Sequence, residues 1–460
     1  MTESDLSVPA EAVRLSRKLS DRQAHIGIVG LGYVGLPLAV EFAKAGFRTT
    51  GLDVNLDRVV RLNSGENYIE DVANDDLHLA LSSRMFSATS NFEDAAKMDV
   101  VFICVPTPVR SHKDPDTSFI YSAATSLAPH LHAGQLIILK STTWPGTTEE
   151  LVGPVLEKVA KVKGLKLGED YFLAFSPERI DPGNKRFTTA NTPVVVGGAT
   201  TVCTDVACRA IEQVVSLVHR VTSPRVAEME KLLENIFRSV NIALVNELAR
   251  LCDRVGGISV WEVVEAAATK PFGYMPFYPG PGLGGHCIPI DPYYLSWLAR
   301  RFDFETSFIT LSARTNEEMP HYVVEAVLRA IAEQPIRLSE ARVLVLGAAF
   351  KKDVDDTRHS PAQKLIELLL LEGVSKVDIS DSHVPVFRAS TSKGILHLES
   401  VPLTKETVGT YDVLILATDH SDYPYEMLAN EARWIVDTRN AFSHIENPRA
   451  TILLLGGGRF

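Results

Sequence analysis

The pattern of apolar and polar positions divides the chain into short apolar runs and longer amphipathic stretches. From His25 the letters HIGIVGLGYVGLPLAVEFAKAGFRTTGLDVN give an apolar run, a glycine turn, a helix-length stretch that Gly46 can close, and a second apolar run ending near Asp53. This is the pattern of a strand–helix–strand unit. Further apolar runs over residues 99–108 and 135–143, separated by helix-length segments, predict a parallel sheet wound on both faces.

A long amphipathic stretch over residues 223–256 predicts a single helix. Ser223 can cap its start, Pro224 suits the first turn, and Gly256 can close it. Such a helix is about 45 Å long at 1.5 Å per residue, and it is a natural place for two subunits to meet. Its apolar positions at helical spacing are Met229, Leu232, Leu233, Ile236, Val240, Ala243, Leu244, Leu248 and Leu251.

A second alternation of apolar runs and a helix begins at residues 341–350. It continues through KVDISD, YDVLILATDH and RWIVDTRN, and it ends in LLLGGGRF, which predicts a strand and a flexible tail. We therefore predict an α/β fold with two Rossmann-like, doubly wound domains joined by a long central helix. The expected parts are a leader (1–24), a first Rossmann domain (25–222), a central helical segment (223–330) and a second Rossmann-like domain (331–460).

Composition narrows the class of protein. With 460 residues, 45% of them hydrophobic and 22% charged, the chain is long enough for two or three globular domains. No run approaches the roughly 18 apolar residues of a membrane span, and the polar leader lacks the apolar core of a secretory signal. A net charge of −11 without a basic block argues against nucleic-acid binding. Five cysteines without metal-ligand spacing fit a cytoplasmic protein with free thiols and no bound metal.

The hexapeptide GLGYVG predicts a dinucleotide site. Its Gly30, Gly32 and Gly35 permit a tight turn, a close approach of pyrophosphate, and packing of helix on strand. Asp53 can accept hydrogen bonds from a ribose and would repel a 2′-phosphate, which favours NAD over NADP. The alternatives are a glycine turn that serves packing alone and, for Arg58, a solvated charge rather than a neighbour of that phosphate.

The segment YPGPGLGGHCIPIDPYY places Cys287 in a loop rich in glycine and proline. The prolines restrict the loop, and Gly284 and Gly285 leave room for a ligand beside the backbone. Because a thiol packed in a core needs no such scaffold, we interpret Cys287 as a nucleophile whose thiolate is favoured by His286, Lys231 or a helix end. The alternative is a structural thiol in a stiff loop.

Charged side chains in two other segments are candidates for the same site. Lys231 and Asn235 are four residues apart on the long predicted helix and so share one face. Glu178 and Arg179 follow a strand in SPERIDPG, where the carboxylate is available as a general base. A solvated polar stripe and a salt-bridged loop acid are the respective alternatives.

The segment FKKDVDDTRHSPA suggests a second phosphate site. Lys351 and Arg358 lie between the first strand of the second α/β half and a helix that Ser360 can cap. Basic side chains near a helix N-terminus favour an anion there, although they also serve purely structural ion pairs.

Taken in order, these motifs resemble the UDP-glucose/GDP-mannose dehydrogenase family. The matching segments are GLGYVGLPLA, VPTP, KSTTWPGTT, SPERIDPG, EMEKLLENIFRSVNIALVNELA, PGPGLGGHCIPIDP and AFKKDVDDTRHSP. The resemblance covers nearly the whole chain after residue 24. It implies an NAD-dependent, four-electron oxidation of C6 of a nucleotide-bound sugar from alcohol to carboxylate.

Position by position, the resemblance also implies roles. Cys287 would form a thiohemiacetal and then a thioester, and Glu178 would assist its hydrolysis. Catalytic positions are Cys287, Lys231, Asn235, Asp291, Glu178 and Thr142. Cofactor-binding positions are Gly30, Gly32, Tyr33, Val34, Gly35, Asp53, Arg58, Pro106, Thr107, Thr142 and Arg358. Substrate-binding positions are Glu178, Arg179, Lys231, Asn235, Gly284, Gly285, Lys351 and Arg439.

The expected partners are a UDP-sugar and a second copy of the chain, in a homodimer or a higher homo-oligomer. UDP-glucose enzymes of this family typically carry lysine before the aspartate of the cysteine loop, where this chain has Ile290. The resemblance therefore favours the bacterial branch that acts on UDP-N-acetylglucosamine for surface polysaccharides. UDP-glucose, UDP-N-acetylmannosamine and UDP-N-acetylgalactosamine remain alternatives. A two-electron hydroxyacid-type dehydrogenase and a non-catalytic NAD-binding protein are rivals of different classes.

Overall fold

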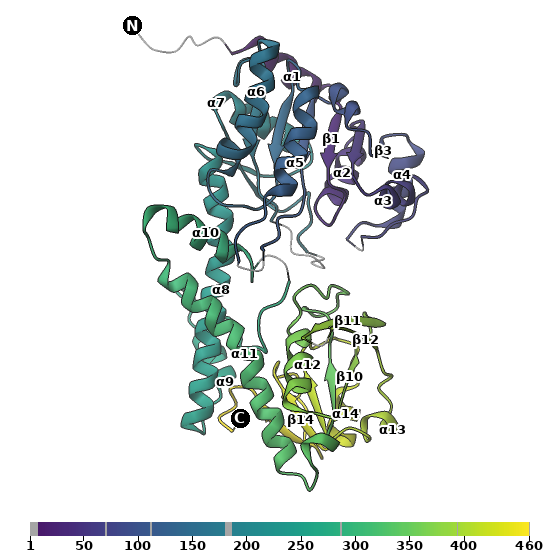
Figure 1. Cartoon of the computed structure of the whole chain (residues 1–460), viewed down its shortest axis with the longest axis vertical. Helices are drawn as coiled ribbons and strands as arrows, with labels where there is room; N and C mark the ends of the chain where they lie inside the picture. The colour runs from purple at the N-terminus through teal and green to yellow at the C-terminus, as the bar shows by residue number, and fades with distance from the viewer. Residues whose placement is uncertain are drawn as a thin grey trace. The chain divides into compact units, whose positions relative to one another are not determined.

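The computed structural model describes residues 8–69, 71–110, 113–179, 186–285, 288–392 and 394–459. Contacts divide the chain into two compact units (Figure 1). The first unit is Met1–Glu234 with Tyr293–Phe302, and the second is Asn235–Pro292 with Asp303–Phe460. Helices α8 (Pro224–Val255) and α10 (Asp291–Ala299) each contribute residues to both units.

The first unit is built on an eight-stranded sheet whose order is β3-β2-β1-β4-β5-β6-β7-β8. Strands β3 to β6 run parallel, and β7 is antiparallel to β6. The 3-2-1-4-5-6 part is the order of dinucleotide-binding sheets. The strands are β1 (Ile26–Val29), β2 (Thr49–Leu52), β3 (Phe86–Thr89), β4 (Val100–Ile103), β5 (Leu136–Leu139), β6 (Phe172–Phe175), β7 (Val194–Gly198) and β8 (Val218–Arg220).

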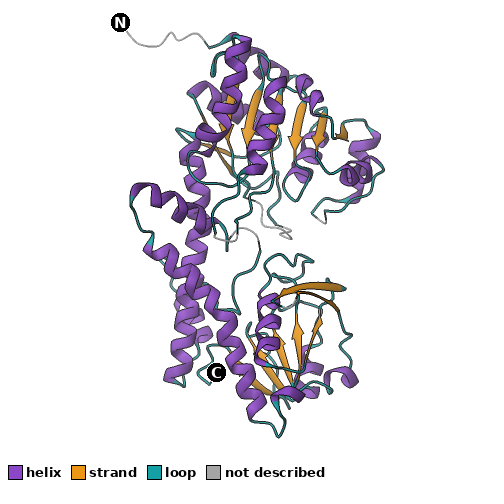
Figure 2. Ribbon diagram, in the orientation of Figure 1, coloured by secondary structure: helices purple, strands orange, loops and turns teal. Residues whose placement is uncertain are grey.

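Both faces of this sheet are covered, as the apolar strands predict. Ile28 and Phe102 face a core shared with α1, α2 and α7, whereas Val101 and Ile103 face a core shared with α5 and α6 (Figure 2). Residues 10–20 of the expected leader form α1, whose Leu15 is buried in the first core. The helices are α1 (Ala10–Ser20), α2 (Gly35–Lys44), α3 (Leu56–Asn63), α4 (Asn74–Ser82), α5 (Ser118–Leu127), α6 (Gly153–Lys163) and α7 (Thr201–Ile211).

The second unit contains a five-stranded parallel sheet of order β10-β9-β13-β14-β15 and a β11–β12 hairpin. Numbered within the five-stranded sheet, the order is 2-1-3-4-5, the other common doubly wound arrangement. The expectation of two doubly wound α/β sheets is confirmed. The strands are β9 (Arg342–Leu346), β10 (Lys376–Ser380), β11 (Val386–Thr391), β12 (Gly394–Glu399), β13 (Val413–Leu416), β14 (Trp434–Asp437) and β15 (Thr451–Leu454).

Helices pack on both faces of the second sheet. Val345 faces a core with α11 and α12, and Leu346 faces a core with α14. The expected flexible tail is instead packed: Asp253 accepts the backbone N–H groups of Gly456 and Gly458, and Trp261 donates to the carbonyl of Leu455. The helices are α9 (Val260–Ala268), α11 (Ser307–Ala332), α12 (Pro361–Glu372), α13 (Lys405–Val408) and α14 (Tyr425–Glu431).

Helix α8 has the predicted length and ends. The backbone N–H of Val226 donates to the Ser223 hydroxyl, and Gly256 adopts a φ of +78° just beyond the last turn. Its apolar residues do not share one environment, however. Leu232, Ile236 and Ala243 are buried. A second set at helical spacing is exposed: Val226, Met229, Leu233, Phe237, Leu244, Leu248, Leu251 and Val255.

The structure also bears on the membrane and thiol expectations. In the described ranges no helix is both long and apolar enough to cross a bilayer. Cys104, Cys203, Cys208 and Cys252 are free thiols. Burial raises the pKa of Cys104 to about 12, so this thiol is protonated at neutral pH and is a poor nucleophile.

Candidate active site

The three glycines of the β1–α2 turn have three different environments. Gly30 has a φ of +91°, and a Cβ there would lie 2.7 Å from the carbonyl oxygen of Cys104. A Cβ on Gly35 would lie 1.8 Å from the carbonyl oxygen of Gly30, so glycine is required for α2 to pack on β1. A Cβ on Gly32 would meet nothing within 4 Å. The open position is the one at which a pyrophosphate needs to approach the backbone, and the turn therefore fits a dinucleotide.

The acid after β2 is held beside that turn. Asp53 is 5% exposed, and its carboxylate accepts the backbone N–H groups of Leu31 and Asn55, both at 2.9 Å. Arg58 lies 3.5 Å from the same carboxylate, so it is a paired charge and not only a solvated one. The carboxylate is thus fixed at the carboxyl end of β2, where the ribose partner is expected.

The remaining expected cofactor residues lie at the same edge of the sheet. Tyr33 is exposed in the turn, Val34 directly precedes α2, and Pro106 and Thr107 follow β4. The reversal of strand order falls between β1 and β4, and in open α/β sheets this is where ligands bind. The carbonyl of Thr107 accepts a hydrogen bond from the hydroxyl of Tyr294, which α10 contributes to this unit.

An ion pair joins the loops after β5 and β6. Lys140 is buried, and its Nζ lies 3.5 Å from the Glu178 carboxylate and 3.5 Å from the carbonyl of Pro177. Since β5 and β6 are parallel neighbours, these loops share one edge. Thr142 is half-buried two residues after Lys140. The expected general base is therefore held by a buried lysine that the sequence analysis did not select.

Arg179 connects the Glu178 loop to α8. Its guanidinium forms ion pairs with Glu230 and Glu234, which are one turn apart on the helix, and its backbone N–H donates to Glu178. Burial, with a hydrogen bond and repulsion from Glu234, raises the pKa of Glu230 to about 7. Burial acts to raise the pKa of Glu234 too, but hydrogen bonds from Arg179 and Glu230 lower it overall. One carboxyl of the pair is thus poised to titrate near neutral pH.

A fully buried carboxylate anchors the start of α8. Glu228 accepts hydrogen bonds from the backbone N–H groups of Gly146 and Thr148 and from the Thr148 hydroxyl. These donors lie just after the KSTT segment of the β5 loop, where a π-helical turn, Thr148–Val152, begins. Burial raises the pKa of Glu228 while these hydrogen bonds act to lower it. Glu228 therefore ties the first turns of α8 to the loop that carries Thr142.

The expected catalytic residues of α8 are buried. Lys231 and Asn235 lie one turn apart, and neither is on a solvated stripe. The amide of Asn235 donates to the carboxylate of Asp291 at 2.5 Å, and both side chains are almost fully buried. Asn235 and Asp291 thus form a hydrogen-bonded pair within the second unit, at the N-terminal residue of α10.

The glycines before the expected nucleophile have a packing role. A Cβ on Gly284 would lie 2.5 Å from Phe350, and Gly285, at a φ of +80°, donates its N–H to the carbonyl of Arg358 at 2.9 Å. The cysteine loop is therefore laid directly on the β9–α12 segment. Cys287 and His286 lie outside the described residues. Ile290, which follows them, is 5% exposed.

The expected substrate residues of the second unit lie after β9 and β14. Lys351 and Arg358 are half-buried in the β9–α12 segment, and Asp356 orients the Arg358 guanidinium through bonds of 2.5 to 3.0 Å. Arg439 donates to the carbonyl of Ala417, and burial lowers its pKa. A Cβ on Gly280 would lie 2.8 Å from the Arg439 guanidinium, which places this side chain under the start of the cysteine loop.

Comparison with known proteins identifies the family. Residues 24–215 match the NAD binding domain of the UDP-glucose/GDP-mannose dehydrogenase family, residues 225–318 its central domain and residues 344–444 its UDP binding domain. The chain belongs to this family. It is an NAD-dependent nucleotide-sugar dehydrogenase of the UDP-sugar 6-dehydrogenase type.

Relatives and solved structures agree with this assignment. The chain is 38% identical over 400 residues to a UDP-N-acetyl-D-glucosamine 6-dehydrogenase of Pseudomonas aeruginosa, which covers 86% of this chain and 91% of that protein. It is 35% identical over 440 residues to a UDP-N-acetyl-D-mannosamine dehydrogenase of Pyrococcus horikoshii, covering 94% and 99%. The structure of UDP-D-ManNAc dehydrogenase from that organism matches with a TM-score of 0.83 and 32% identity, over 95% of this chain and 100% of the other.

Four polar residues of the first unit were missed by sequence reasoning. Lys140 had a visible signal, because it is the first residue after β5, at the ligand edge of the sheet. Glu228, Glu230 and Glu234 had none, since acids on an amphipathic helix are usually solvated. Only their tertiary neighbours reveal that they hold the loops around Glu178 and Thr142.

The second and third glycines of the fingerprint give a matched test. Gly35→Ala should lower stability by roughly 3 kcal/mol, because the new methyl group overlaps the Gly30 carbonyl. Gly32→Ala should leave the Tm of the NAD-free protein unchanged, yet weaken NAD binding about tenfold by occupying the approach of the pyrophosphate. Thermal unfolding and calorimetric titration with NAD measure both effects. Wild-type NAD affinity in Gly32→Ala would contradict the assignment of the open position.

The Glu230 carboxyl gives a pH test. Because its folded pKa of about 7 lies above its ordinary value of 4.5, its contribution to stability is complete below pH 4.5 and is lost as pH rises through 7. Glu230→Gln keeps a neutral side chain at all pH values. Its Tm should therefore match wild type near pH 5 and exceed it by about 2 °C or more at pH 8. A Tm difference that stays constant from pH 5 to pH 8 would refute the raised pKa.

Proposed function

We propose that the chain oxidises C6 of UDP-N-acetylglucosamine to the carboxylate, in two hydride transfers to NAD with a covalent intermediate on Cys287. UDP-glucose and the N-acetylmannosamine and N-acetylgalactosamine analogues are the alternative substrates. The observation that carries the proposal is the buried Asn235–Asp291 pair, whose Asp291 follows Cys287 by four residues within the family's motif order. At a cysteine loop, a buried amide can donate a hydrogen bond to an oxyanion, and a buried carboxylate can accept one from a water molecule.

The thiol has a definite chemical task in this scheme. The first oxidation converts the C6 alcohol to an aldehyde, with loss of a hydride and a proton. Addition of the Cys287 thiolate to the aldehyde gives a thiohemiacetal, so the aldehyde cannot escape before the second oxidation. Loss of a second hydride gives a thioester, and water then releases the carboxylate and restores the thiol. NAD accepts the hydride in each oxidation.

The chain's own residues supply the remaining functions. Lys231 and Asn235 stabilise the oxyanion of the thiohemiacetal, as a buried cation and an amide donor on one face of α8. Glu178, held by Lys140, is the base that activates water for hydrolysis of the thioester. Asp291 and Thr142 position that water and its protons. Lys351 and Arg439 contact the nucleotide-sugar, and Arg358 reaches the phosphates of NAD.

The substrate preference rests on two supports. The relative with 38% identity acts on UDP-N-acetylglucosamine by its name, whereas other relatives act on N-acetylmannosamine or N-acetylgalactosaminuronate derivatives. Ile290 is buried, and it occupies the position at which UDP-glucose enzymes of this family typically carry lysine. An apolar side chain removes a charge from the cysteine loop and is consistent with a substrate other than UDP-glucose.

We also propose that the chain pairs with a second copy through the exposed apolar residues of α8. Eight large apolar side chains at helical spacing along one 32-residue helix are unusual on the surface of a monomer. The stripe extends over the full helix, with Val226 near the first turn and Val255 at the last. A self-complementary helix face is the common basis of two-fold symmetric dimers.

The stoichiometry of NADH tests the reaction. With UDP-N-acetylglucosamine, UDP-N-acetylgalactosamine, UDP-glucose and UDP-N-acetylmannosamine offered in turn, we expect the first to give the highest kcat/KM and two NADH per sugar. Cys287→Ser should lower turnover by about 10³-fold or more and give at most one NADH per sugar. The matched control is Cys252→Ser, because this thiol packs against the Trp261 cluster and is not among the proposed catalytic residues. It should retain wild-type turnover. One NADH per sugar in the wild type would indicate a two-electron enzyme.

The α8 stripe is tested by charge substitution. The double variant Leu244→Glu/Leu251→Glu should sediment as a monomer, because two carboxylates cannot be buried in an apolar interface without large cost. Val162→Glu on α6, where the native side chain is 87% exposed, is the control and should leave the oligomer intact. Sedimentation velocity distinguishes the species. An unchanged oligomer in the double variant would place the interface elsewhere.

A further inference from the structure

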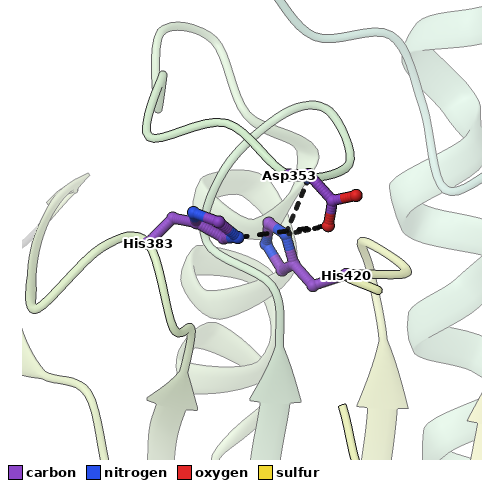
Figure 3. Close-up of side chains that lie close together, drawn as sticks. All are labelled: Asp353, His383 and His420. Carbon is purple, nitrogen blue, oxygen red and sulfur yellow. Dashed lines mark hydrogen bonds and ion pairs between the residues drawn. The ribbon is translucent and has the colours of Figure 1, made fainter. Parts of the chain in front are cut away.

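Three polar side chains gather at the ligand edge of the second sheet. Asp353 comes from the segment after β9, His383 from the segment after β10, and His420 from the segment after β13 (Figure 3). The strand order reverses between β9 and β13, so this is the switch point at which α/β sheets bind ligands. The Asp353 segment also carries Lys351, for which the proposed function assigns a nucleotide contact.

Both ring nitrogens of His420 have defined partners. The side chain is 0% exposed, its Nε2 lies 3.0 Å from the Asp381 carboxylate, and its Nδ1 lies 3.0 Å from the backbone nitrogen of Asp353. The backbone N–H can only donate, so Nδ1 is the acceptor and carries no proton. Nε2 therefore carries the proton and donates it to Asp381. The neutral imidazole acts as a fixed bridge between two segments.

Asp381 anchors the other end of that bridge. Its carboxylate also accepts the backbone N–H groups of Ala348 and Ala349, at 2.7 and 2.9 Å, and those of His383 and Val384. Burial acts to raise the pKa of Asp381, but the His420 and backbone hydrogen bonds lower it overall. The carboxylate is thus ionised, and it holds the start of the β9 segment as well as the imidazole.

The backbone that His420 holds is strained. Asp353 has a φ of +57°, a left-handed conformation that is unfavourable for a residue other than glycine. Its side chain is clamped by the backbone N–H and the hydroxyl of Ser421, at 2.7 and 2.6 Å. Thr418 donates to the carbonyl of Ala349 at 2.7 Å. Asp381 and the loop after β13 therefore supply all of these hydrogen bonds to the segment that carries Lys351.

A metal site is the competing interpretation of the same side chains. One potential ligand atom from each of Asp353, His383 and His420 lies within 4.8 Å of the others. A metal ion would need the Nδ1 lone pair of His420, which already accepts the Asp353 N–H. His383 is exposed, and its ring centroid lies 4.8 Å from that of His420. Its Nε2 lies 4.0 Å from the Asp353 carboxylate, which is too long for a hydrogen bond. The hydrogen bonds therefore favour a structural bridge.

We propose that His420 is a positioning residue: bridged to Asp381, it holds the strained Asp353 backbone and so keeps Lys351 in the conformation that binds the uridine diphosphate part of the substrate. This inference rests on the proposed role of Lys351. A pre-formed segment loses less conformational entropy on binding than a loose one, so loss of the bridge weakens binding without altering the chemical step. The effect should fall mainly on the nucleotide-sugar, since Arg358, which is proposed to reach NAD from this segment, is oriented by Asp356, and the other proposed NAD contacts lie in the first unit.

Substitutions at His420 in the full-length chain test the bridge. His420→Phe keeps the ring and removes both hydrogen bonds, and it should raise the calorimetric Kd for UDP and the KM for the UDP-sugar about tenfold or more. The kcat at saturation and the KM for NAD should stay within about threefold. His420→Asn retains an acceptor near the Nδ1 position and should recover most of the UDP affinity. Equal UDP affinity in His420→Phe and the wild type would overturn the proposal.

A second variant protects the test against misfolding of His420→Phe. Asp353→Gly accepts a φ of +57° without strain but loses the carboxylate clamp, so it should fold at least as well as wild type. Its Kd for UDP should rise about threefold or more, because the glycine backbone is more flexible and is held at this position only by its hydrogen bond to His420. A normal Kd in this variant would show that fixing the segment at residue 353 does not matter for binding, and it would overturn the proposal.

His383→Gln separates the bridge from a metal site. A bridge that does not use His383 predicts a Kd for UDP within twofold of wild type, with or without prior dialysis against EDTA. A metal site would instead predict that UDP affinity falls on dialysis, returns when Zn²⁺ is added, and is lost in His383→Gln. That result would overturn the bridge. UDP binding is measured without turnover, so a wild type that binds UDP but oxidises none of the four sugars would refute the proposed reaction and leave this inference intact.

Discussion

The structure depends on a buried carboxylate placed directly after the second strand, in chain order, of each large sheet. In the first unit Asp53 follows β2 and accepts the N–H of Leu31, in the turn after β1. In the second unit Asp381 follows β10 and accepts the N–H groups of Ala348 and Ala349, in the segment after β9. Backbone N–H groups that leave the end of a parallel strand have no ladder partner and must be paired. The same solution therefore shapes the ligand edge of both sheets.

The carboxylates of the two units have different neighbours. Asp53 is adjacent to a glycine turn with one open position, so a dinucleotide can approach the backbone. Asp381 is adjacent to a segment without that fingerprint and is bridged by His420 to Asp353. Because the second segment lacks this glycine fingerprint, the proposed contact with phosphate falls to its basic side chains. This difference agrees with an NAD binding domain followed by a UDP binding domain.

Helix α8 holds the segments that carry the proposed catalytic residues. Glu228 binds the segment after the β5 loop, Glu230 and Glu234 bind Arg179 next to Glu178, and Asn235 binds Asp291. All of these contacts come from three consecutive turns of one helix. A rigid helix fixes its own side chains more precisely than a loop does, so α8 holds the loops around Glu178 and Thr142 within the first unit and Asp291 within the second.

The sequence by itself determined the two sheets, the long helix, the glycine turn and the acid after β2. Each of these leaves a local signal: apolar runs, helical spacing, or glycine at a fixed interval before a strand-ending aspartate. The β11–β12 hairpin was not foreseen: β11 buries only Phe387 and Ala389, and β12 buries none of its residues. Nor was the packed C-terminal tail, which depends on Asp253 and Trp261 far away in the chain.

Only the tertiary structure decided which polar residues matter beyond the motifs. Lys140, Glu228 and His420 resemble ordinary charged or polar residues in the sequence, because burial and partners are set by segments that are distant along the chain. The apolar positions of α8 likewise formed one broad face in the sequence, yet the structure buries Leu232 and exposes Leu233. Helical spacing gives the direction of a side chain from its own axis, whereas what lies in that direction depends on the fold.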